Sequence, residues 1–146
     1  MPTRTSRTAW NGSLQEGSGQ VELSSSGAGT FDVDFPKRAS DSPQGQTSPE
    51  ELVAAAHSAC FAMSLSNEIA QAGGTPHGIE VTAEVDLGPD PRAGGFVLTA
   101  IRLRGTVEAD GLDEAGFRKA VDAAEAGCPV SKALTGVDIT LDAALA

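Results

Sequence analysis

The sequence predicts an α+β fold whose strands are mainly antiparallel. Two observations carry this prediction. Several short segments alternate apolar and polar residues with the period of two that marks half-buried strands. Two longer segments begin and end with residues that start and stop helices. In chain order the elements read β-β-β-α-β-β-α-β, which is typical of α+β proteins.

The first third of the chain is expected to form a small antiparallel sheet. Residues 20–23 (QVEL) and 31–35 (FDVDF) alternate apolar and polar side chains, as strands with one buried face do. A glycine-rich turn at residues 27–29 would join them. A further strand around Trp10 would end at the Asn-Gly dipeptide of residues 11–12, which favours tight hairpins.

A polar loop and then a well-marked helix follow. The loop, PKRASDSPQGQT, covers residues 36–47, a length that is often functional in a compact domain. The helix begins with Ser48 as its N-cap and Pro49 at its first position, and Glu51 completes an S-x-x-E capping box. A glycine pair at residues 73–74 ends the helix.

The middle of this helix is apolar on all sides. From residue 52 to residue 65 it reads LVAAAHSACFAMSL and carries no charged side chain. A helix that is apolar all round is buried on most sides, and a chain of 146 residues offers little to surround it. We therefore expect sheets and a second copy of the chain to cover this helix.

The second half begins with two more strands. Residues 79–87 and 96–107 have the strand pattern, and a segment rich in glycine and proline connects them. In the longer strand the apolar phase changes between Ala100 and Ile101. Such a change of phase indicates a β-bulge.

A second long helix, a short helix and a last strand complete the chain. The long helix is expected to run from its N-cap, Asp113, to Gly127. Cys128 then lies at the start of a short helix whose first position is Pro129. Residues 137–141 alternate as a strand.

The composition is that of a globular protein and excludes several classes of function. The 146 residues suffice for one domain, residues 1–146, and 40% are hydrophobic. A net charge of −10 repels phosphate backbones and anionic lipids, so neither nucleic acid nor a membrane is an expected partner. The N-terminus lacks the apolar region of a secretory signal. The expected location is the cytoplasm.

The chain contains two cysteines, Cys60 and Cys128, and in a reducing compartment these are free thiols, metal ligands or a redox pair. Cys60 lies in mid-helix, where a cysteine commonly packs as a small apolar residue. A reactive Cys60 would need a nearby cation to lower its pKa. Cys128 stands at a helix start, whose free N–H groups favour a thiolate. The pattern leaves open whether the two approach within disulfide range.

Arg38 is the best candidate for that cation. Its planar fork of donors can bind a thiolate and a peroxide oxygen together, although a solvated loop arginine is the plainer interpretation. Glu50 lies ten residues before Cys60, about 15 Å along one helix axis, so it cannot touch that thiol within one straight helix. Glu50 either stabilises the helix N-terminus alone, or acts through an intermediary or from a second chain.

The two histidines give a weaker indication. His57 lies three residues before Cys60, on a neighbouring face of the helix, and is expected to be a core or interface residue rather than a catalytic one. A zinc site made of His57, His77, Cys60 and Cys128 is an alternative. No pair of these ligands has the spacing typical of zinc fingers.

Two long motifs resemble the OsmC family of hydroperoxide reductases, which is related to the organic hydroperoxide resistance (Ohr) proteins. They are SPEELVAAAHSACFAMSLS at residues 48–66 and AGCPVSKAL at residues 126–134. The resemblance extends over nearly the whole chain, and the forms AAHSACF and GCPVS are closer to the OsmC branch than to the Ohr branch. It implies an intertwined homodimer in which antiparallel sheets wrap around two central helices per subunit.

The resemblance also implies roles for four residues. Cys60 corresponds to the peroxidatic cysteine and Cys128 to the resolving one. The arginine of the family falls on Arg38, with Lys37 as the neighbour to be excluded, and its carboxylate falls on Glu50. The sites of the family lie at the dimer interface, which agrees with the distance between Glu50 and Cys60 along their helix.

The implied function is a thiol-dependent peroxidase for oxidative or osmotic stress defence. It would reduce organic hydroperoxides, and hydrogen peroxide less efficiently, to alcohols or water. The resolving thiol would form a disulfide with the peroxidatic one, and an external dithiol, such as a lipoyl group, would reduce it. No metal or organic cofactor is required. The alternative is a non-enzymatic, stress-induced dimer that binds a small apolar ligand at its interface, with Cys60 merely packed.

Overall fold

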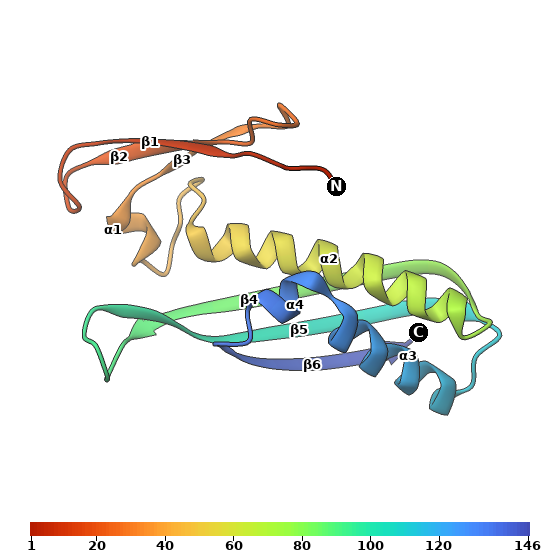
Figure 1. Ribbon diagram of the computed structural model, residues 1–146. Helices are drawn as coiled ribbons and strands as arrows, with labels where there is room; N and C mark the ends of the chain where they lie inside the picture. The colour runs from red at the N-terminus through yellow and green to blue at the C-terminus, as the bar shows by residue number, and fades with distance from the viewer. The chain divides into compact units, whose positions relative to one another are not determined.

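The computed structural model describes all 146 residues, as two compact units, Met1–Leu52 and Val53–Ala146 (Figure 1). Each unit contains one sheet of three strands, in the orders β1-β2-β3 and β4-β5-β6. The predicted α+β class, with two sheets and two long helices, is confirmed. The single domain and the homodimer stay predictions.

The sheet of the first unit is antiparallel, as predicted. Its strands are β1 (Arg7–Asn11), β2 (Ser18–Glu22) and β3 (Thr30–Val33). The tight Asn-Gly hairpin is wrong, because Asn11 still pairs with Ser18 and the connection covers residues 12–17. This wider turn is held by the Trp10 indole, which donates to the Gly12 carbonyl at 3.0 Å, and by φ of +94° at Gly12.

The polar segment after β3 is not wholly a loop. The predicted strand ends at Val33, and a short helix, α1 (Phe35–Arg38), replaces Phe35 and the start of the loop. Asp34 is its N-cap and accepts from the Lys37 N–H at 2.7 Å, while Pro36 suits the first turn of a helix. The Asp-x-Pro sequence was the missed signal.

The long central helix, α2, covers Pro49–Gln71 and has the predicted ends. Ser48 caps it, since its hydroxyl accepts from the Glu51 N–H at 3.1 Å. The Glu51 carboxylate binds the Thr47 hydroxyl at 2.6 Å, which ties the loop to the first turn. Beyond the last residue of the helix, Gly73 has φ of +89°, a conformation that favours glycine.

The sheet of the second unit is mixed. Strands β4 (Thr75–Pro89) and β5 (Phe96–Asp110) are antiparallel, whereas β6 (Asp138–Leu145) is parallel to β5. The predicted bulge is confirmed, because Asp86 pairs with Ala100 and Leu87 with Leu98, which leaves Thr99 unpaired. Strand β4 begins at Thr75 rather than at Ile79.

Two further helices belong to the second unit. Helix α3 (Glu114–Gly127) has the predicted N-cap, Asp113, whose carboxylate accepts from the Gly116 N–H at 2.7 Å. Helix α4 (Pro129–Ala133) starts directly after Cys128, as predicted. The connection α3-α4 thus carries the chain from the end of β5 back to β6, which lies parallel to it.

The core of the second unit lies between the helices and one face of the sheet (Figure 1). Phe61 is fully buried here. Burial of each large apolar side chain contributes about 1.5–3 kcal/mol. The core side chains of α2 recur every fourth residue, as one helical face requires, and they meet those of α3 and β5: Phe61, Leu65, Ile69, Leu103, Val107 and Phe117.

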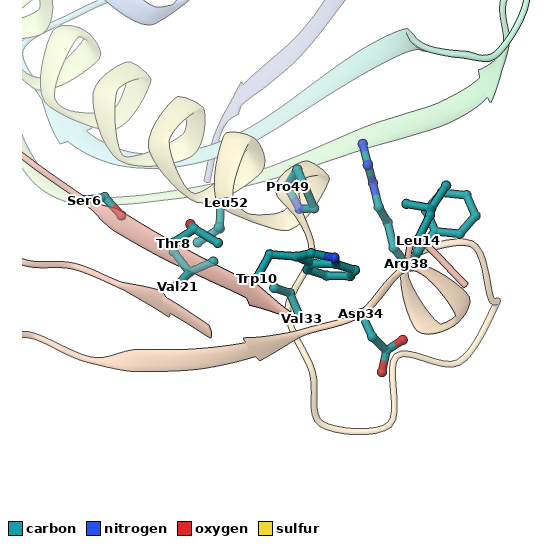
Figure 2. Close-up of a pocket in the computed structure, with 11 residues that line it drawn as sticks. Ser6, Thr8, Trp10, Leu14, Val21, Val33, Asp34, Arg38, Pro49 and Leu52 are labelled. Atoms are coloured by element: carbon teal, nitrogen blue, oxygen red, sulfur yellow. The ribbon is translucent and has the colours of Figure 1, made fainter. Parts of the chain in front are cut away.

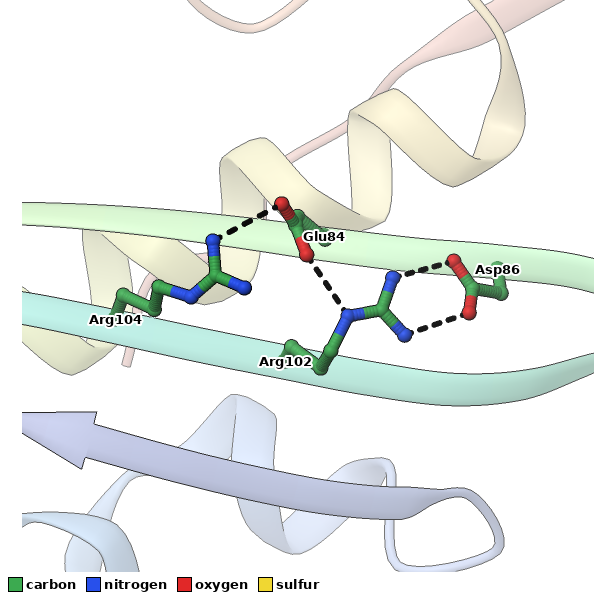
Figure 3. A network of polar contacts seen from close by, with 4 residues as sticks. All are labelled: Glu84, Asp86, Arg102 and Arg104. Atoms are coloured by element: carbon green, nitrogen blue, oxygen red, sulfur yellow. Dashed lines mark hydrogen bonds and ion pairs between the residues drawn. The ribbon is translucent and has the colours of Figure 1, made fainter. Parts of the chain in front are cut away.

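The opposite face of this sheet is polar. Arg102 donates to Asp86 at 2.6 and 2.8 Å and to Glu84 at 2.8 Å, and Glu84 also accepts from Arg104 (Figure 3). The arginines lower the pKa of both carboxyl groups. These side chains are all partly exposed, so each pair adds little stability, and the network marks a solvated face.

Candidate active site

The two cysteines lie in contact in the second unit. Cys60 comes from α2 and Cys128 from the junction of α3 and α4, and their Sγ atoms are 3.2 Å apart. Both are free thiols, Cys60 partly exposed and Cys128 fully buried. The separation exceeds the bond length of a disulfide, about 2.05 Å, by little more than 1 Å. A disulfide can therefore form with a small movement.

The junction between the helices places Cys128 at the N-terminus of α4. Helix α3 ends at Gly127, and Cys128 has an extended backbone, with φ of −62° and ψ of 117°. Pro129 then starts the new helix, where its missing N–H costs nothing. The sulfur of Cys128 consequently lies at the positive end of a short helix.

The surroundings shift the pKa values of the two thiols in opposite directions. Burial raises the pKa of Cys60, the neighbouring Cys128 raises it further, and the Val130 N–H opposes both. Burial also disfavours the thiolate of Cys128, but its pKa is lowered overall, because the hydroxyl and N–H of Ser131, the Cys60 thiol and the Val130 N–H stabilise the negative charge. A thiolate at Cys60 would thus require a nearby cation.

A second polar contact accompanies the thiol pair. His57 Nε2 lies 2.7 Å from the Ser131 hydroxyl, and both residues are buried. Burial lowers the pKa of His57, so its ring is neutral at pH 7. His57 Nδ1 is buried without a hydrogen-bond partner. The expectation of a core histidine is confirmed, whereas its partner Ser131 was missed.

Arg38 and Glu50 form an ion pair in the first unit. The guanidinium Nη2 donates to Glu50 Oε1 at 2.7 Å, and Nε lies 3.1 Å from both carboxylate oxygens. Glu50 is 8% exposed, so its carboxylate is shielded from water, whereas the Arg38 side chain is 31% exposed. Two donors of Arg38 hold the guanidinium plane in a fixed orientation. The neighbouring Lys37 pairs with Asp34 at 3.1 Å.

An apolar pocket of about 490 Å³ opens beside this arginine. It lies within the first unit, and its lining comes from the first sheet, from α1 and from the start of α2 (Figure 2). Asp34 and Arg38 are the charged residues of a lining that is otherwise largely apolar. The apolar side chains include Trp10, Leu14, Val33, Pro49 and Leu52.

The zinc alternative is not supported. His77 bonds Asp110 at 2.8 Å, where β4 pairs with β5. No group of three or more histidine, cysteine, aspartate or glutamate side chains is arranged to hold a metal ion. His57, His77, Cys60 and Cys128 therefore do not form a group that could hold zinc. None of the helices has the length and apolar character needed to cross a membrane.

Comparisons with known proteins point to one family over most of the chain. The family model described as OsmC-like protein matches residues 41–142. The chain is 41% identical to peroxiredoxin OsmC of Escherichia coli over 133 residues, and this aligned region covers 91% of this chain and 90% of that protein. It is 33% identical over 113 residues to the organic hydroperoxide resistance protein OhrB of Bacillus subtilis, covering 77% and 79%.

Solved structures show the same fold. The crystal structure of OhrB from Bacillus subtilis has a TM-score of 0.72 and 30% identity, covering 96% of this chain and 98% of that one. An organic hydroperoxide resistance protein from Elizabethkingia anophelis, with thiocyanate bound, has a TM-score of 0.80 and 26% identity, covering 100% and 98%. The fold predicted from the sequence thus has experimentally solved counterparts.

Proposed function

This chain belongs to the OsmC family, and we propose that it is a cysteine-based peroxidase that reduces organic hydroperoxides to alcohols. The observation that carries this proposal is the contact of the two thiols, with their Sγ atoms 3.2 Å apart. A peroxide supplies the oxidant, and two adjacent thiols supply the two electrons that its reduction requires.

The first step of the proposed reaction is attack by the Cys60 thiolate on the terminal oxygen of the hydroperoxide ROOH. An S–O bond forms, the O–O bond breaks, and the alkoxide takes up a proton and leaves as the alcohol ROH. Cys60 is oxidised to a sulfenic acid. Cys60 fits this role because it is the partly exposed thiol of the pair, whereas Cys128 is fully buried.

In the second step Cys128 resolves the sulfenic acid. Its thiolate attacks the Cys60 sulfur, the S–S bond forms, the S–O bond breaks, and the oxygen leaves as water after taking up a proton. Two exchange steps with an external dithiol, such as a lipoyl group, then restore both thiols and convert the dithiol to its disulfide. The lowered pKa of Cys128 suits it to act as nucleophile in the second step and as leaving group in the reduction.

Arg38 is the proposed source of the cation that Cys60 requires. Without one, burial and Cys128 keep the Cys60 thiol protonated. A guanidinium would stabilise the thiolate and the negative charge that develops on the leaving oxygen. Glu50 would orient Arg38 through the short ion pair, and the engagement of Lys37 by Asp34 favours Arg38 over its neighbour.

The apolar pocket supports an organic substrate. An alkyl or aryl group of ROOH gains free energy by leaving water for a site lined by side chains such as Trp10 and Leu52, whereas hydrogen peroxide has no such group. Because Arg38 also lines this pocket, the peroxide end of a substrate held there can meet the guanidinium. Hydrogen peroxide is therefore the poorer proposed substrate.

The proposed working form is a homodimer. In a single chain one face of α2, which includes Ala55, Ala59 and Met63, is exposed, and Met63 is 73% exposed. An apolar helix face of this kind is typically covered by a partner, and a second copy of α2 presents the same small residues. Sites at such an interface could combine the Arg38–Glu50 pair of one subunit with the thiols of the other.

One experiment tests the function. The wild-type protein is supplied in turn with cumene hydroperoxide and hydrogen peroxide, with lipoamide, thioredoxin or glutathione as donor, and turnover is followed. Efficient turnover of the organic peroxide with a dithiol is expected. Intact-mass spectrometry after one equivalent of peroxide should show a loss of about 2 Da as the disulfide forms. Two thiols that still titrate after this treatment would contradict the proposal and favour a ligand-binding dimer.

The dimer has a separate test. Subunits carrying Cys60→Ser are mixed with subunits carrying Glu50→Ala, and the exchanged mixture is assayed. If each site draws on two chains, a heterodimer regains one intact site and part of the activity. Complementation requires exchange, so light scattering and tagged subunits must first show that mixed dimers form. Mixed dimers without any recovery would count against a site shared between chains.

A further inference from the structure

Two side-chain contacts, one beside the other, join α2 to the N-cap and first turn of α4. His57 meets Ser131 at 2.7 Å, and Cys60 meets Cys128 at 3.2 Å. His57 and Cys60, and likewise Cys128 and Ser131, are three positions apart, which makes the two residues of each set neighbours on the surface of their segment. The order is crossed, since the earlier residue of α2 meets the later residue of α4. The contact of His57 with Ser131 therefore fixes how α4 lies along α2, and with it the position in which the two sulfur atoms meet.

We propose that His57 and Ser131 are positioning residues of the peroxidase reaction, which hold Cys128 against Cys60 and donate a hydrogen bond to its sulfur. The two residues are named the His57–Ser131 clamp below. The proposal deepens the proposed function and rests on it, because it assigns the clamp to the resolving half of the reaction.

The location of Ser131 supports this role. Cys128 is the N-cap of α4 and Ser131 its third residue, and a side chain at this third position reaches back toward the N-cap. The Cys128 thiol makes no side-chain capping hydrogen bond in this structure, so we assign the Ser131 hydroxyl as the donor once Cys128 ionises, in keeping with the lowering of the Cys128 pKa by Ser131. When the single hydroxyl hydrogen points to the sulfur, the oxygen must accept from its other neighbour, which is His57.

The state of His57 agrees with this direction. The buried ring is neutral and carries one hydrogen. With that hydrogen on Nε2, His57 donates to Ser131, and the lone pair at Nδ1 is the group left without a partner. A buried polar group with an open position costs stability, and an apolar residue would fill the same place at lower cost. A histidine is suited to this place if its Nε2–H orients the Ser131 hydroxyl.

The chemical consequence concerns the second step. A thiolate at Cys128 attacks the sulfenic sulfur of Cys60, and the clamp raises the fraction of Cys128 that is ionised. A thiolate of lower pKa is also a weaker nucleophile, with a Brønsted coefficient of about 0.4–0.5. Loss of one hydrogen bond should lower the thiolate fraction about tenfold. The partial compensation in nucleophilicity leaves a net slowing of about threefold.

The first test needs no peroxidase activity. In Cys60→Ser protein only Cys128 titrates as a thiol, and its ionisation is followed by the ultraviolet absorbance of the thiolate. Adding Ser131→Ala or His57→Phe should raise the pKa of Cys128, by about one for the serine variant. Ser131→Thr keeps the hydroxyl and should restore the original value. Ser58→Ala is the matched control, because Ser58 is also on α2 but bonds the Ala55 carbonyl.

The second test separates the two chemical steps. After one equivalent of cumene hydroperoxide, quenched samples report the sulfenic acid, which is about 16 Da heavier, and the disulfide, which is about 2 Da lighter. Ser131→Ala and His57→Phe should slow the disulfide phase about threefold and the oxidation phase much less. Circular dichroism of each variant shows whether it folds.

The outcomes distinguish the two proposals. An unchanged Cys128 titration in both folded variants, or equal slowing of both phases, would overturn the clamp while leaving the peroxidase intact. If wild-type protein consumes no peroxide, the proposed function fails and the clamp loses its assigned step. Should either variant be unfolded, the other variant and the Ser131→Thr protein carry the same comparison.

Discussion

The thiol pair and the Arg38–Glu50 pair differ in what each of them lacks. The thiol pair brings the proposed nucleophile and the proposed resolving thiol into contact, but its surroundings raise the pKa of Cys60. The Arg38–Glu50 pair has an oriented positive charge beside an apolar pocket, but no sulfur. One unit therefore holds the two thiols, and the other holds the positive charge that the proposed reaction assigns to them.

This division has a chemical advantage. A thiolate that is activated all the time is open to over-oxidation and to exchange with other disulfides. If Cys60 ionises only where Arg38 reaches it, its reactivity depends on the complete assembly. We therefore expect the activity, the dimeric assembly and the pKa of Cys60 to change together when the charge of Arg38 is removed. When a thiol is removed, these three properties should change separately.

The largest effect is expected from removing the nucleophile. Cys60→Ser should lower the turnover of cumene hydroperoxide by about a thousandfold or more, since serine has no accessible anion at neutral pH. Cys128→Ser should still consume one equivalent of peroxide per site to reach the sulfenic acid, or further equivalents where Cys60 is over-oxidised, and then stop. The measurement is peroxide consumption against time. Similar full turnover in both variants would contradict the assignment of two distinct roles.

Removing the charge should have the next largest effect. Arg38→Ala is expected to slow the oxidation of Cys60 about a hundredfold, because a lost cation raises the thiol pKa and leaves the developing oxyanion unpaired. The pH–rate profile should also shift to higher pH. Lys37→Ala is the matched control, since Lys37 is engaged by Asp34, and it should change the rate little. Equal losses of oxidation rate in the two variants would contradict the assignment of the cation to Arg38 rather than to Lys37.

Removing the carboxylate should have a smaller effect. Glu50→Gln keeps a side chain of the same size and at least one possible hydrogen bond to Arg38, but loses the charge. We expect a loss of about tenfold in turnover, with the pH profile displaced less than in Arg38→Ala. Stopped-flow oxidation over a range of pH measures both quantities. A loss as large as that of Arg38→Ala would mean that Glu50 acts on the reaction directly.

Much of the fold could be predicted because its signals are local. The capping residues Ser48 and Asp113, and the change of apolar phase near Thr99, each act within a few residues. Helix α1 was missed because a strand pattern at residues 31–35 was read past its end. The aspartate at position 34 was counted as a polar strand residue, whereas its side chain caps a helix.

The candidate site was less predictable because contacts between distant segments create it. The spacing of residues 60 and 128 says nothing about the 3.2 Å between their sulfurs, and the resemblance supplied that pairing. The contact of His57 with Ser131 spans a similar separation in sequence and had no signal of its own. Periodicity shows which face of a helix is apolar but not what covers it.

The smallest expected effect concerns the pH dependence of stability in the second unit. His57 is buried and neutral in the folded protein, with a pKa below the ordinary value of 6.5. As the pH falls through 6.5 the unfolded chain therefore binds a proton that the folded one does not, so the free energy of unfolding decreases. The limiting slope for one proton is about 1.4 kcal/mol per pH unit.

Urea unfolding at pH 7.5 and pH 5.5 measures this effect, with His57→Gln as the comparison. The wild type should lose stability between the two values, and the variant should lose less. The carboxyl groups with lowered pKa values, Asp34, Glu84 and Asp86, have ordinary values of 3.8, 4.5 and 3.8. Their contribution is lost only as the pH falls below about these values, outside the window. Equal losses in both proteins would show that His57 takes up its proton in the folded state, and the neutral donor to Ser131 would then be wrong.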